Sequence, residues 1–381
     1  MKILQISHRV PYPLNEGGTI GIYNYTRGFA EAGVDVTLVC LNGIKHKINV
    51  KEAEHELKKY CKLYIFDIDT NVKPLAAFLN LFTNQSYNVC RFYNRTFELF
   101  LANLLDSEKF DIIQVEGTFV AMYHDVLRQH SQAPLVLRQH NVEYQIWERL
   151  EGNETNPLKK WYLNLLARRL KNFEKTFTDK FDAIVPVTQD DGTLFEKLGC
   201  TKPIFVSPAG INTSYWQPSD SENPFHIFHL GSLEWTPNLE AVLWFIKEVW
   251  PLLLKIDTRF KLFIAGKNMP DIMKQLKTEN VVMVGEVKDG ADFIKDKAIT
   301  VVPLLSGSGI RLKILEAMAA SKLVISTTIG AQGIEYVNGK HLLIADTPEE
   351  FVSLFKKIAE NPECYDEVKK EGFELIKSKY A

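Results

Sequence analysis

The chain has 381 residues, of which 46% are hydrophobic and 24% are charged. This length predicts more than one domain, and this composition is typical of a folded globular protein rather than a disordered one. The net charge of -2 gives no indication of a protein that binds nucleic acid. The five cysteines are widely spaced and include no C-x-x-C pair, so neither a zinc site nor a disulfide framework is indicated.

The apolar run at the amino terminus is too short for a signal peptide, and polar residues and prolines follow it at once. No stretch reaches the roughly 18 apolar residues that a membrane-spanning helix requires. We therefore expect a cytoplasmic protein that is soluble or lies peripherally at the inner face of the membrane.

In the first half of the chain, short apolar runs alternate with amphipathic stretches. The apolar runs predict strands at Lys2–Ser7, Val34–Leu41, Leu63–Ile68, Asp111–Glu116, Pro134–Gln139 and Ala183–Val187. The amphipathic stretches predict helices at Tyr23–Ala32, Lys51–Tyr60, Thr96–Ser107 and Leu158–Thr178.

The same alternation restarts after about residue 200, beyond a stretch rich in Pro, Ser and Asn. Further strands are predicted at Ile204–Ser207, Phe225–Leu230, Lys261–Ala265, Val281–Val284, Thr300–Leu304, Leu323–Thr327 and Leu342–Ala345. Further helices are predicted at Leu239–Leu254, Asp271–Thr278, Ile310–Ala320 and Pro348–Asn361.

Nearly continuous apolar strands that alternate with helices are typical of parallel sheets buried on both faces. The fold class is therefore α/β, with two doubly wound Rossmann-like domains that face each other across a cleft. We place the first domain at residues 1–203 and the second at 204–365, followed by a helix at 366–381. In such sheets, ligands bind beyond the carboxyl ends of the strands.

A glycine-rich loop, Ser306–Gly309, follows the strand predicted at Thr300–Leu304 and precedes a helix. Glycines allow close backbone approach, and a helix amino terminus attracts anions. Arg311 and Lys313 in the first turn oppose the helix dipole, which an anionic ligand would explain. Glu316 offers a carboxylate acceptor for sugar hydroxyls. The alternative is a surface helix on which Lys313 and Glu316 form an ordinary i,i+3 pair.

The run Gly307–Ala319 resembles the donor-binding motif of GT-B glycosyltransferases, especially glycosyltransferase family 4, also called glycosyl transferases group 1. Further matching stretches occur in the same order along nearly the whole chain, at residues 11–18, 138–143, 206–212, 230–232 and 326–333.

The resemblance implies retaining transfer of a sugar from a UDP- or GDP-sugar to a hydroxyl of a saccharide or lipid-linked acceptor. It implies a role in cell-envelope polysaccharide or glycolipid synthesis, with no metal and no other cofactor. It also implies that the helix at 366–381 returns toward the first domain.

The resemblance assigns roles to residues at three places. It makes His140, Arg311, Lys313 and Glu316 the catalytic set. It assigns donor binding to Gly17, Gly18, Gly231, Ser232, Ser308, Gly309 and Ile310. Glu116, Asn141 and Glu143 lie at or just beyond the carboxyl ends of predicted strands, where this architecture places its site, and we assign them to the acceptor side. The alternatives are a structural histidine, glutamates that cap the following helices, and a flexible loop at the Gly17–Gly18 pair.

The chain departs from the family pattern at two points. The family usually has two glutamates separated by seven residues, but the first position here is Ser308 and only the second is a glutamate, Glu316. Many members also carry Arg and Lys after the first strand of the second domain, where this chain has Gly231–Asn238, with neither. We infer that Arg311 and Lys313 neutralise the donor diphosphate instead.

Two other patterns have competing interpretations. Asp67 and Asp69 form a D-x-D pattern, which we interpret as a coincidence because it ends a strand of a doubly wound domain. The basic and aromatic run Lys159–Lys171, with Leu75–Phe82, predicts either an ordinary amphipathic helix or contact with an anionic membrane. At the level of the whole chain, the alternatives to a transferase are a non-catalytic nucleotide-sugar-binding protein and a nucleotide-sugar epimerase.

Overall fold

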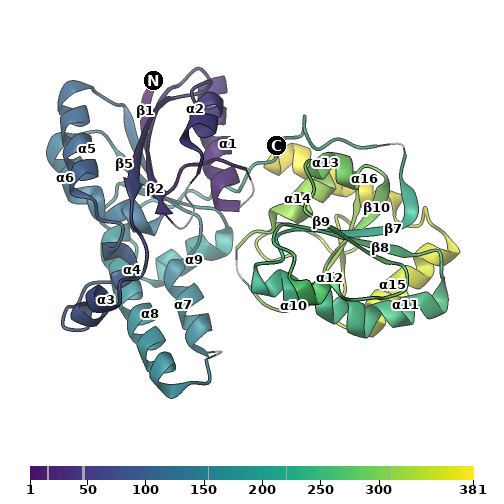
Figure 1. The fold of residues 1–381 in the computed structure, drawn as a ribbon. Helices are drawn as coiled ribbons and strands as arrows, with labels where there is room; N and C mark the ends of the chain where they lie inside the picture. The colour runs from purple at the N-terminus through teal and green to yellow at the C-terminus, as the bar shows by residue number, and fades with distance from the viewer. Residues whose placement is uncertain (15–16, 45–47, 153, 220, 308) are drawn as a thin grey trace. The chain divides into compact units, whose positions relative to one another are not determined.

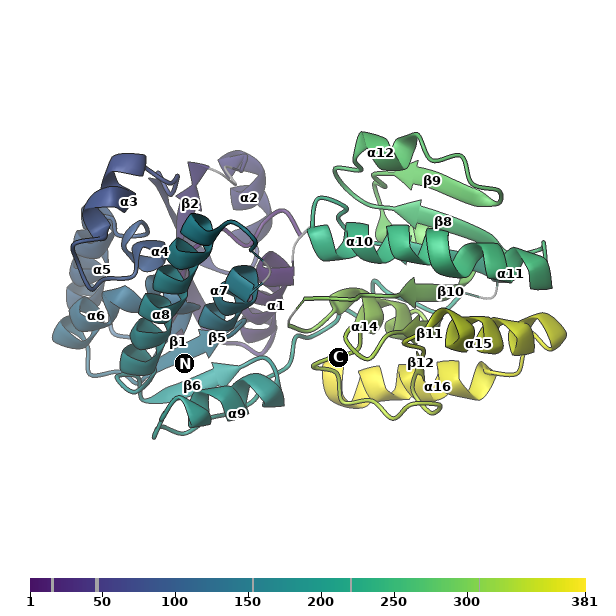
Figure 2. The same ribbon diagram turned by 90° about the horizontal axis from the view of Figure 1, so that it is seen from below.

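The computed structural model describes residues 1–14, 17–44, 48–152, 154–219, 221–307 and 309–381. The chain divides into two compact units, Met1–Pro208 and Ala209–Ala381. Each unit consists of a parallel sheet with helices on both of its faces (Figures 1 and 2). The expected α/β architecture is confirmed.

The described residues of the first unit form a six-stranded sheet in the order β3-β2-β1-β4-β5-β6. Its strands are β1 Lys2–Ser7, β2 Asp35–Gly43, β3 Lys62–Ile68, β4 Ile112–Glu116, β5 Leu135–Gln139 and β6 Ala183–Pro186. Its helices are α1 Gly17–Glu31, α2 Val50–Leu57, α3 Pro74–Asn80, α4 Tyr87–Cys90, α5 Arg95–Ser107, η2 Thr118–Tyr123, α6 His124–His130, α7 Glu143–Gly152, α8 Pro157–Thr178 and α9 Gln189–Lys197.

The second unit repeats this plan in its described residues, with the strand order β12-β11-β10-β7-β8-β9. Its strands are β7 Asn223–Leu230, β8 Lys261–Ala265, β9 Val281–Gly285, β10 Lys297–Val302, β11 Leu323–Ser326 and β12 Leu343–Ile344. Its helices are α10 Thr236–Trp244, η3 Phe245–Val249, α11 Trp250–Ile256, α12 Asp271–Lys274, α13 Gly290–Ile294, α14 Leu312–Ala319, α15 Pro348–Glu360, α16 Asp366–Leu375 and η4 Ile376–Tyr380.

The apolar strands divide their side chains between two hydrophobic clusters, one on each face of the sheet. In β2, Val39 and Leu41 pack in one cluster, whereas Leu38 and Cys40 pack in the other. The side chains of a strand point alternately to opposite faces, so a sheet covered on both faces requires apolar residues at successive positions. This requirement explains the uninterrupted apolar runs in the sequence.

The strand predicted at Ile204–Ser207 is not formed; it is reduced to an isolated bridge between Ile184 and Ile204. The segment runs along the outer side of β6, which is the last strand of the sheet. No further strand covers it in the described structure, and Phe205 is 62% exposed. Backbone bonds from Phe205 N to Ile184 O (3.0 Å) and from Ser207 N to Pro186 O (2.9 Å) nevertheless join this segment to the first unit. The first unit therefore extends to Pro208.

The helix predicted at Leu239–Leu254 is divided into α10, the π-helical segment η3 and α11. Pro251, in the first turn of α11, has no backbone N–H to donate, and its ring would collide with a carbonyl four residues earlier. The wider π-helical turn before the proline avoids that collision.

The last helical segments, α16 and η4, pack on the second unit. Leu375, Ile376 and Tyr380 lie in a core cluster of that unit. The hydroxyl oxygen of Tyr380 accepts a hydrogen bond of 2.9 Å from Glu335 N, and Ile211 N donates to the backbone oxygen of Tyr380 at 2.6 Å. These contacts tie the carboxyl-terminal residues to the start and the middle of the second unit.

The strand order reverses between β1 and β4 in the first unit and between β7 and β10 in the second. At such a reversal, the loops that leave the two neighbouring strands turn in opposite directions and leave room for a ligand. The fold therefore directs attention to the segments that follow Ser7 and Glu116, and to those that follow Leu230 and Val302.

We predict that Gly266→Ala destabilises the second unit. Gly266 follows β8, and a Cβ atom there would lie 1.8 Å from the backbone oxygen of Gly231, so the backbone would have to move. Overpacking of this kind costs about 1–3 kcal/mol. Urea unfolding followed by tryptophan fluorescence measures this loss, because the fully buried Trp250 belongs to the same unit.

The matched control is Gly28→Ala, at a helical position where an added Cβ meets nothing within 4 Å. It should leave stability unchanged or raise it slightly. Equal unfolding midpoints for Gly266→Ala and the unmodified protein would contradict the prediction.

Candidate functional site

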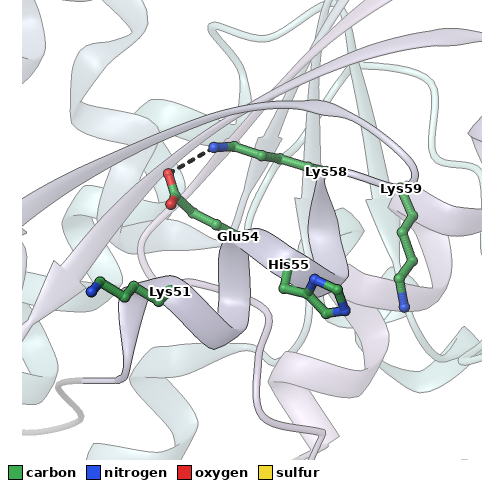
Figure 3. Close-up of a pocket in the computed structure, with 5 residues that line it drawn as sticks. All are labelled: Lys51, Glu54, His55, Lys58 and Lys59. Carbon is green, nitrogen blue, oxygen red and sulfur yellow. Dashed lines mark hydrogen bonds and ion pairs between the residues drawn. The ribbon is translucent and has the colours of Figure 1, made fainter.

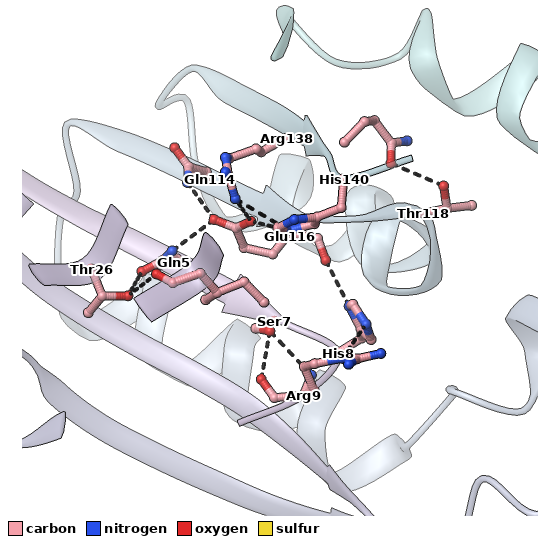
Figure 4. A network of polar contacts seen from close by, with 12 residues as sticks. Gln5, Ser7, His8, Arg9, Thr26, Gln114, Glu116, Thr118, Arg138 and His140 are labelled. Carbon is pink, nitrogen blue, oxygen red and sulfur yellow. Dashed lines mark hydrogen bonds and ion pairs between the residues drawn. The ribbon is translucent and has the colours of Figure 1, made fainter. Parts of the chain in front are cut away.

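A buried glutamate lies at the carboxyl end of β4 and organises the site of the first unit (Figure 4). One carboxylate oxygen of Glu116, Oε1, accepts hydrogen bonds from Gln5 Nε2 (2.8 Å) and Gln114 Nε2 (2.6 Å). The other, Oε2, lies 3.0 Å from Arg138 Nη1 and 2.9 Å from His140 Nε2. Burial alone would raise the pKa of Glu116, but the charge of Arg138 and the hydrogen bond to His140 outweigh it and lower the pKa. The carboxylate is therefore ionised.

Glu116 determines the tautomer of His140. Burial, and then the charge of Arg138, lower the pKa of His140, so the ring is neutral. Because the ionised carboxylate only accepts, Nε2 carries the ring proton and donates it to Glu116. The Nδ1 lone pair is then left on the opposite edge of the ring, beside Gly21 of α1, where an added Cβ would lie 3.6 Å from that atom.

Glu116 itself is completely buried, and its four hydrogen-bond positions are taken. The carboxylate thus orients His140 and compensates Arg138, and it does not face solvent as a carboxylate that contacts an acceptor would. Arg138 is also fully buried, with its guanidinium carbon 3.7 Å from the centre of the Tyr25 ring.

The loop after β1 carries a second oriented histidine and an arginine. His8 Nδ1 lies 3.1 Å from the backbone oxygen of Glu116, and Arg9 Nε donates to His8 Nε2 at 3.0 Å. Burial, followed by the charge of Arg9, lowers the pKa of His8 to about 3, so this ring is neutral as well. Arg9 in turn lies beside Gly18, where an added Cβ would be 3.6 Å from Arg9 Nη1. The sequence predicted that Gly17 and Gly18 lie before the helix, but α1 begins at Gly17, so both glycines belong to its first turn.

Asn141 and Glu143 follow β5 and lead into α7, whose amino terminus is capped by a residue of α8. Glu174 Oε1 accepts hydrogen bonds from Thr118 Oγ1 (2.8 Å) and Glu143 N (3.1 Å), and Oε2 accepts from Tyr144 N (2.9 Å). Glu174 thus joins the loop after β4 to the loop after β5, which carries His140. Burial raises the pKa of Glu143 to about 7, and it raises the pKa of Glu174 to the same value.

In the second unit, Lys313 of α14 reaches the loop that follows β7. A Cβ on Gly231 would lie 2.5 Å from Lys313 Nζ, so only glycine leaves room for the ammonium group. Nζ donates to Asn238 Oδ1 at 2.8 Å and lies 3.3 Å from His229 Nε2. Asn238 Nδ2 in turn donates to the backbone oxygen of Ser232 at 2.8 Å, which holds the loop in place.

His229 presents only an acceptor to Lys313. Its Nδ1 lies 2.9 Å from the backbone oxygen of Val301, and a carbonyl oxygen only accepts, so Nδ1 carries the proton and Nε2 the lone pair. Burial, and then the charge of Arg311, lower the pKa of Lys313 to about 7. Among the residues that the structure describes, no carboxylate lies within 4.0 Å of Lys313 Nζ. The ammonium group is thus surrounded by neutral acceptors, His229 Nε2 and Asn238 Oδ1.

Arg311 precedes the first residue of α14 and is 5% exposed. Its guanidinium carbon lies 5.4 Å from the centre of the Trp235 ring, and its Nη1 donates to the backbone oxygen of Gly309. Gly307 and Gly309 have φ angles of 119° and 82°, which favour glycine. Ser308 lies outside the described residues.

Glu316 lies one turn further along α14 and is partly exposed. Within the described structure, its side chain makes no hydrogen bond or ion pair of 4.0 Å or less, so the i,i+3 pair with Lys313, which was the alternative interpretation of this helix, is not formed. Burial raises the pKa of Glu316 to about 7, and the charge of Lys313 partly offsets this effect. Ile310 packs against the same core cluster as α14.

The expected site residues thus fall into two groups. In the first unit, His8, Arg9, Gly18 and Gly21 meet the residues at 116–118 and 138–144. In the second unit, Gly309, Arg311 and Lys313 meet the residues at 229–238. The Asp67–Asp69 pattern belongs to neither: Asp67 Oδ1 accepts from Asn42 Nδ2 at 2.8 Å, and Asp69 lies 3.2 Å from Lys73. A shallow hollow on the outer surface of α2, lined by Lys51, Glu54, His55, Lys58 and Lys59, also lies away from the strand ends (Figure 3).

Several residues of the site were not predicted. Arg138 and His229 are polar residues in strands that are mostly apolar, and that interruption is a weak signal in the sequence, because β5 also ends in Gln139 and β7 also contains His226. Glu174 and Asn238 carry no comparable signal, because each is an ordinary polar residue of a helix until the fold buries it.

Comparison with known families supplies the identity of the chain. Residues 16–215 match the model of Glycosyltransferase Family 4, and residues 224–361 match that of Glycosyl transferases group 1. The chain belongs to glycosyltransferase family 4. The resemblance expected from the glycine-rich loop is therefore confirmed, and the protein is a glycosyltransferase with the GT-B fold.

Individual proteins similar to this glycosyltransferase are distant in sequence but match along nearly their whole length. An uncharacterized 44.6 kDa protein in the cps region of Klebsiella pneumoniae is 24% identical, with 100% of this chain and 96% of the relative covered. Anabaena Alr3699/HepE in complex with UDP has a TM-score of 0.68 at 12% identity, covering 100% of this chain and 96% of its own. Sucrose-phosphate synthase from Thermosynechococcus elongatus has a TM-score of 0.69 at 14% identity, covering 100% and 95%.

We predict that Arg138→Met destabilises the glycosyltransferase in a pH-dependent way. Removing one partner of a buried ion pair costs about 3–5 kcal/mol near neutral pH, because the other charge remains buried. The pKa of Glu116 is lowered in the folded protein, so its contribution to stability is present above the unfolded value of about 4.3 and is lost as pH falls below it. Without Arg138, burial raises this pKa, and the destabilisation should shrink as pH falls from about 7 to about 5.

Urea unfolding followed by circular dichroism at both pH values measures the effect. In the control, Glu116→Gln is combined with Arg138→Met, which removes both charges and should recover much of the loss near neutral pH. A penalty that is equal at both pH values, and equal in the single and double variants, would refute this account of the pair.

Proposed function

We propose that this glycosyltransferase moves a hexosyl group from a UDP-sugar to a hydroxyl of a saccharide or lipid-linked acceptor, with retention of the anomeric configuration. We place the reaction in the synthesis of a cell-envelope polysaccharide or glycolipid. The observation that carries the proposal is the cation at Lys313, held by His229 and Asn238 against the loop after β7.

The diphosphate of the donor is the anion that this arrangement suits. Arg311 can pair with phosphate oxygens in a bidentate way, and Lys313 supplies a second positive charge at the start of the same helix. Gly231 permits Lys313 to stand where many members of the family have basic residues in the loop itself. This geometry supports the inference that Arg311 and Lys313 replace those residues.

The choice of UDP rests on the solved relatives. Alr3699/HepE has been crystallised with UDP, with UDP and glucose, and with UDP-glucose, and a variant of Staphylococcus aureus TarM has been crystallised with UDP and alpha-GlcNAc-glycerol. We assign Glu316 to hydroxyls of the donor, since its carboxylate is partly exposed and makes no hydrogen bond among the described residues. We assign the first unit, with His140, Asn141 and Glu143, to the sugar and the acceptor.

In the proposed reaction, the bond between the anomeric carbon and the diphosphate oxygen breaks while the acceptor oxygen bonds to that carbon on the same face. The proton of the acceptor hydroxyl passes to the departing diphosphate oxygen. Arg311 and Lys313 stabilise the negative charge that develops on the diphosphate, so electrostatic stabilisation is their main contribution. No side chain needs to act as a nucleophile in this scheme, and basic residues take the place of a metal ion.

A donor screen tests the proposal. We expect one UDP-sugar to raise the melting temperature of the full chain, with GDP- and ADP-sugars inactive, and mass spectrometry to detect transfer to a pooled set of acceptors. Nuclear magnetic resonance of the product then establishes the anomeric configuration. Binding without transfer or hydrolysis would favour the non-catalytic alternative, and a response to GDP-sugars alone would overturn the assignment of the base.

A second experiment compares the donor kinetics of variants at Arg259 and Arg311, the two arginines that follow residue 170. Arg311→Ala should raise the donor KM or lower kcat by about tenfold or more, on the scale of a lost charge-assisted contact. Arg259→Ala should leave donor kinetics unchanged, because Arg259 pairs with Asp257 at 2.5 Å ahead of β8. Equal kinetics for the two variants would refute the role of Arg311.

We further predict that donor binding takes up a proton at Lys313. The pKa of this ammonium group is lowered to about 7, and a bound diphosphate would favour its charged form and raise the pKa. Uptake should therefore be clear at about pH 8 and small at about pH 6. Isothermal titration calorimetry with the UDP-sugar, in buffers of different ionisation enthalpy, measures it.

Two variants separate the groups that titrate near neutral pH. Lys313→Met should abolish the uptake, whereas Glu316→Gln should retain it, although the pKa of Glu316 is also about 7. A UDP-sugar is the appropriate ligand because its diphosphate has no terminal group that titrates in this range. Unchanged uptake in Lys313→Met would show that another group takes up the proton.

A further inference from the structure

Helix α3 of the first unit exposes large apolar side chains and buries none of its residues. Leu75 is 71% exposed, and Phe78 and Leu79 are each 56% exposed. Phe82, in the turn that follows, is 78% exposed and packs against Phe78 with ring centres 5.6 Å apart. A short helix with no buried residue gains little stability from the hydrophobic core of its own unit. Its apolar side chains are therefore available for contact with a partner outside the chain.

Helix α3 is nevertheless tied to α8 at its carboxyl end and to α4 at its amino end. The buried guanidinium of Arg169 donates to the backbone oxygens of Asn80 (2.9 Å) and Leu81 (3.0 Å), and also to that of Thr83. At the other end of α3, Lys73 N donates to the hydroxyl of Tyr87 at 2.9 Å. Helix α4 lies between α3 and α8 in the ribbon views (Figures 1 and 2).

Helix α8 adds two apolar side chains at its amino-terminal end. Leu158 is 81% exposed and Trp161 is 60% exposed. We call these two residues and the four exposed residues of the α3 segment the apolar ridge; its members are Leu75, Phe78, Leu79, Phe82, Leu158 and Trp161.

The charges along the ridge are basic. Residues 70–90 and 157–173 contain six basic side chains and no acidic one; the basic residues are Lys73, Lys159, Lys160, Arg168, Arg169 and Lys171. The four lysines among them pair with acidic residues outside the two segments: Lys73 with Asp69 (3.2 Å), Lys159 with Glu154 (2.5 Å), Lys160 with Glu151 (3.8 Å) and Lys171 with Glu148 (3.0 Å). Exposed pairs of this kind contribute little to stability, so the lysines can exchange these partners for others.

We propose that the apolar ridge is a docking surface for an anionic lipid bilayer. Its apolar side chains insert among the acyl chains near the headgroups, Trp161 lies at the headgroup level, and Lys73, Lys159 and Lys160 extend to lipid phosphates. Helix α3 is too short to cross a membrane, and no helix in the described part of the chain is long and apolar enough to do so. The contact is therefore in the plane of the interface.

The charge distribution favours this occupant over a second copy of the chain. A symmetric dimer would set the same surface against itself, so the lysines of one copy would face those of the other. The proposal goes beyond the proposed function and does not depend on it. The ridge nevertheless belongs to the same unit as His140. The chain continues from α3 through α4 to Phe92, and the ring centre of Phe92 lies 6.1 Å from that of His8 in the candidate site.

Vesicle sedimentation with the full chain tests the proposal. The probe is vesicles of phosphatidylglycerol and phosphatidylcholine in a ratio of about one to two, compared with phosphatidylcholine alone. We expect binding to the anionic vesicles that weakens as salt is added. Combining Leu75→Ser, Phe78→Ser and Phe82→Ser should weaken binding by about tenfold or more, because the lost insertion is hydrophobic.

The control combines Ile272→Ser and Val337→Ser, which are 61% and 56% exposed in the second unit and should bind as the unmodified protein does. Circular dichroism melting verifies that the ridge variant remains folded, as expected for exposed positions. Combining Lys73→Gln, Lys159→Gln and Lys160→Gln should weaken binding to anionic vesicles and remove its dependence on salt.

Three results would overturn the proposal. The first is failure of the unmodified protein to bind anionic vesicles at low salt. The second is equal binding of the ridge variant and the control variant. The third is a dimer in analytical ultracentrifugation that dissociates in the ridge variant while neither protein binds vesicles, since the ridge would then be an interface between copies.

Discussion

Both units of this glycosyltransferase depend on one constraint, the reversal of strand order in a parallel sheet. In the first unit, β1 pairs with β2 on one side and β4 on the other, and in the second unit β7 pairs in the same way with β8 and β10. The segments that leave the two central strands turn in opposite directions, so the backbone cannot fill the space between them. His8 and Glu116 lie at one such point, and Gly231 and the glycine-rich loop at the other.

Burial of polar groups at these two points produces a common electrostatic arrangement. Each unit buries a histidine next to a cation: His140 next to Arg138, and His229 next to Lys313. Desolvation and the neighbouring cation keep both rings neutral, and a neutral imidazole has one donor and one acceptor nitrogen. A carboxylate at Glu116 and a carbonyl oxygen at Val301 select opposite tautomers. The two rings are therefore oriented by their partners and not by solvent.

The two cations differ in what compensates their charge. Arg138 is fully buried and forms an ion pair with the ionised Glu116, so its charge is compensated within the protein. Lys313 faces neutral acceptors, and burial lowers its pKa to about 7 because the free protein supplies little to stabilise the ammonium group. An anionic ligand would supply that stabilisation. This contrast supports a structural role for Arg138 and is the physical reason why we propose a role in binding for Lys313.

Much of this protein was determined by the sequence alone. Apolar runs of strand length, separated by helices, can be buried only between two helical layers, so the two parallel sheets followed from the pattern. Glycines before a helix that begins with Arg311 and Lys313 indicated the anion site and the family.

Tertiary structure decided the rest, because the deciding partners are distant in the chain. Glu174 became a helix cap only when α8 brought it to the start of α7, and Lys313 acquired its low pKa only when burial placed it between His229 and Asn238. The strand expected at Ile204–Ser207 was reduced to an isolated bridge with Ile184, although backbone hydrogen bonds still join this segment to β6. Periodicity predicts which faces are buried, but hydrogen bonding between segments far apart in sequence depends on positions that only the folded chain defines.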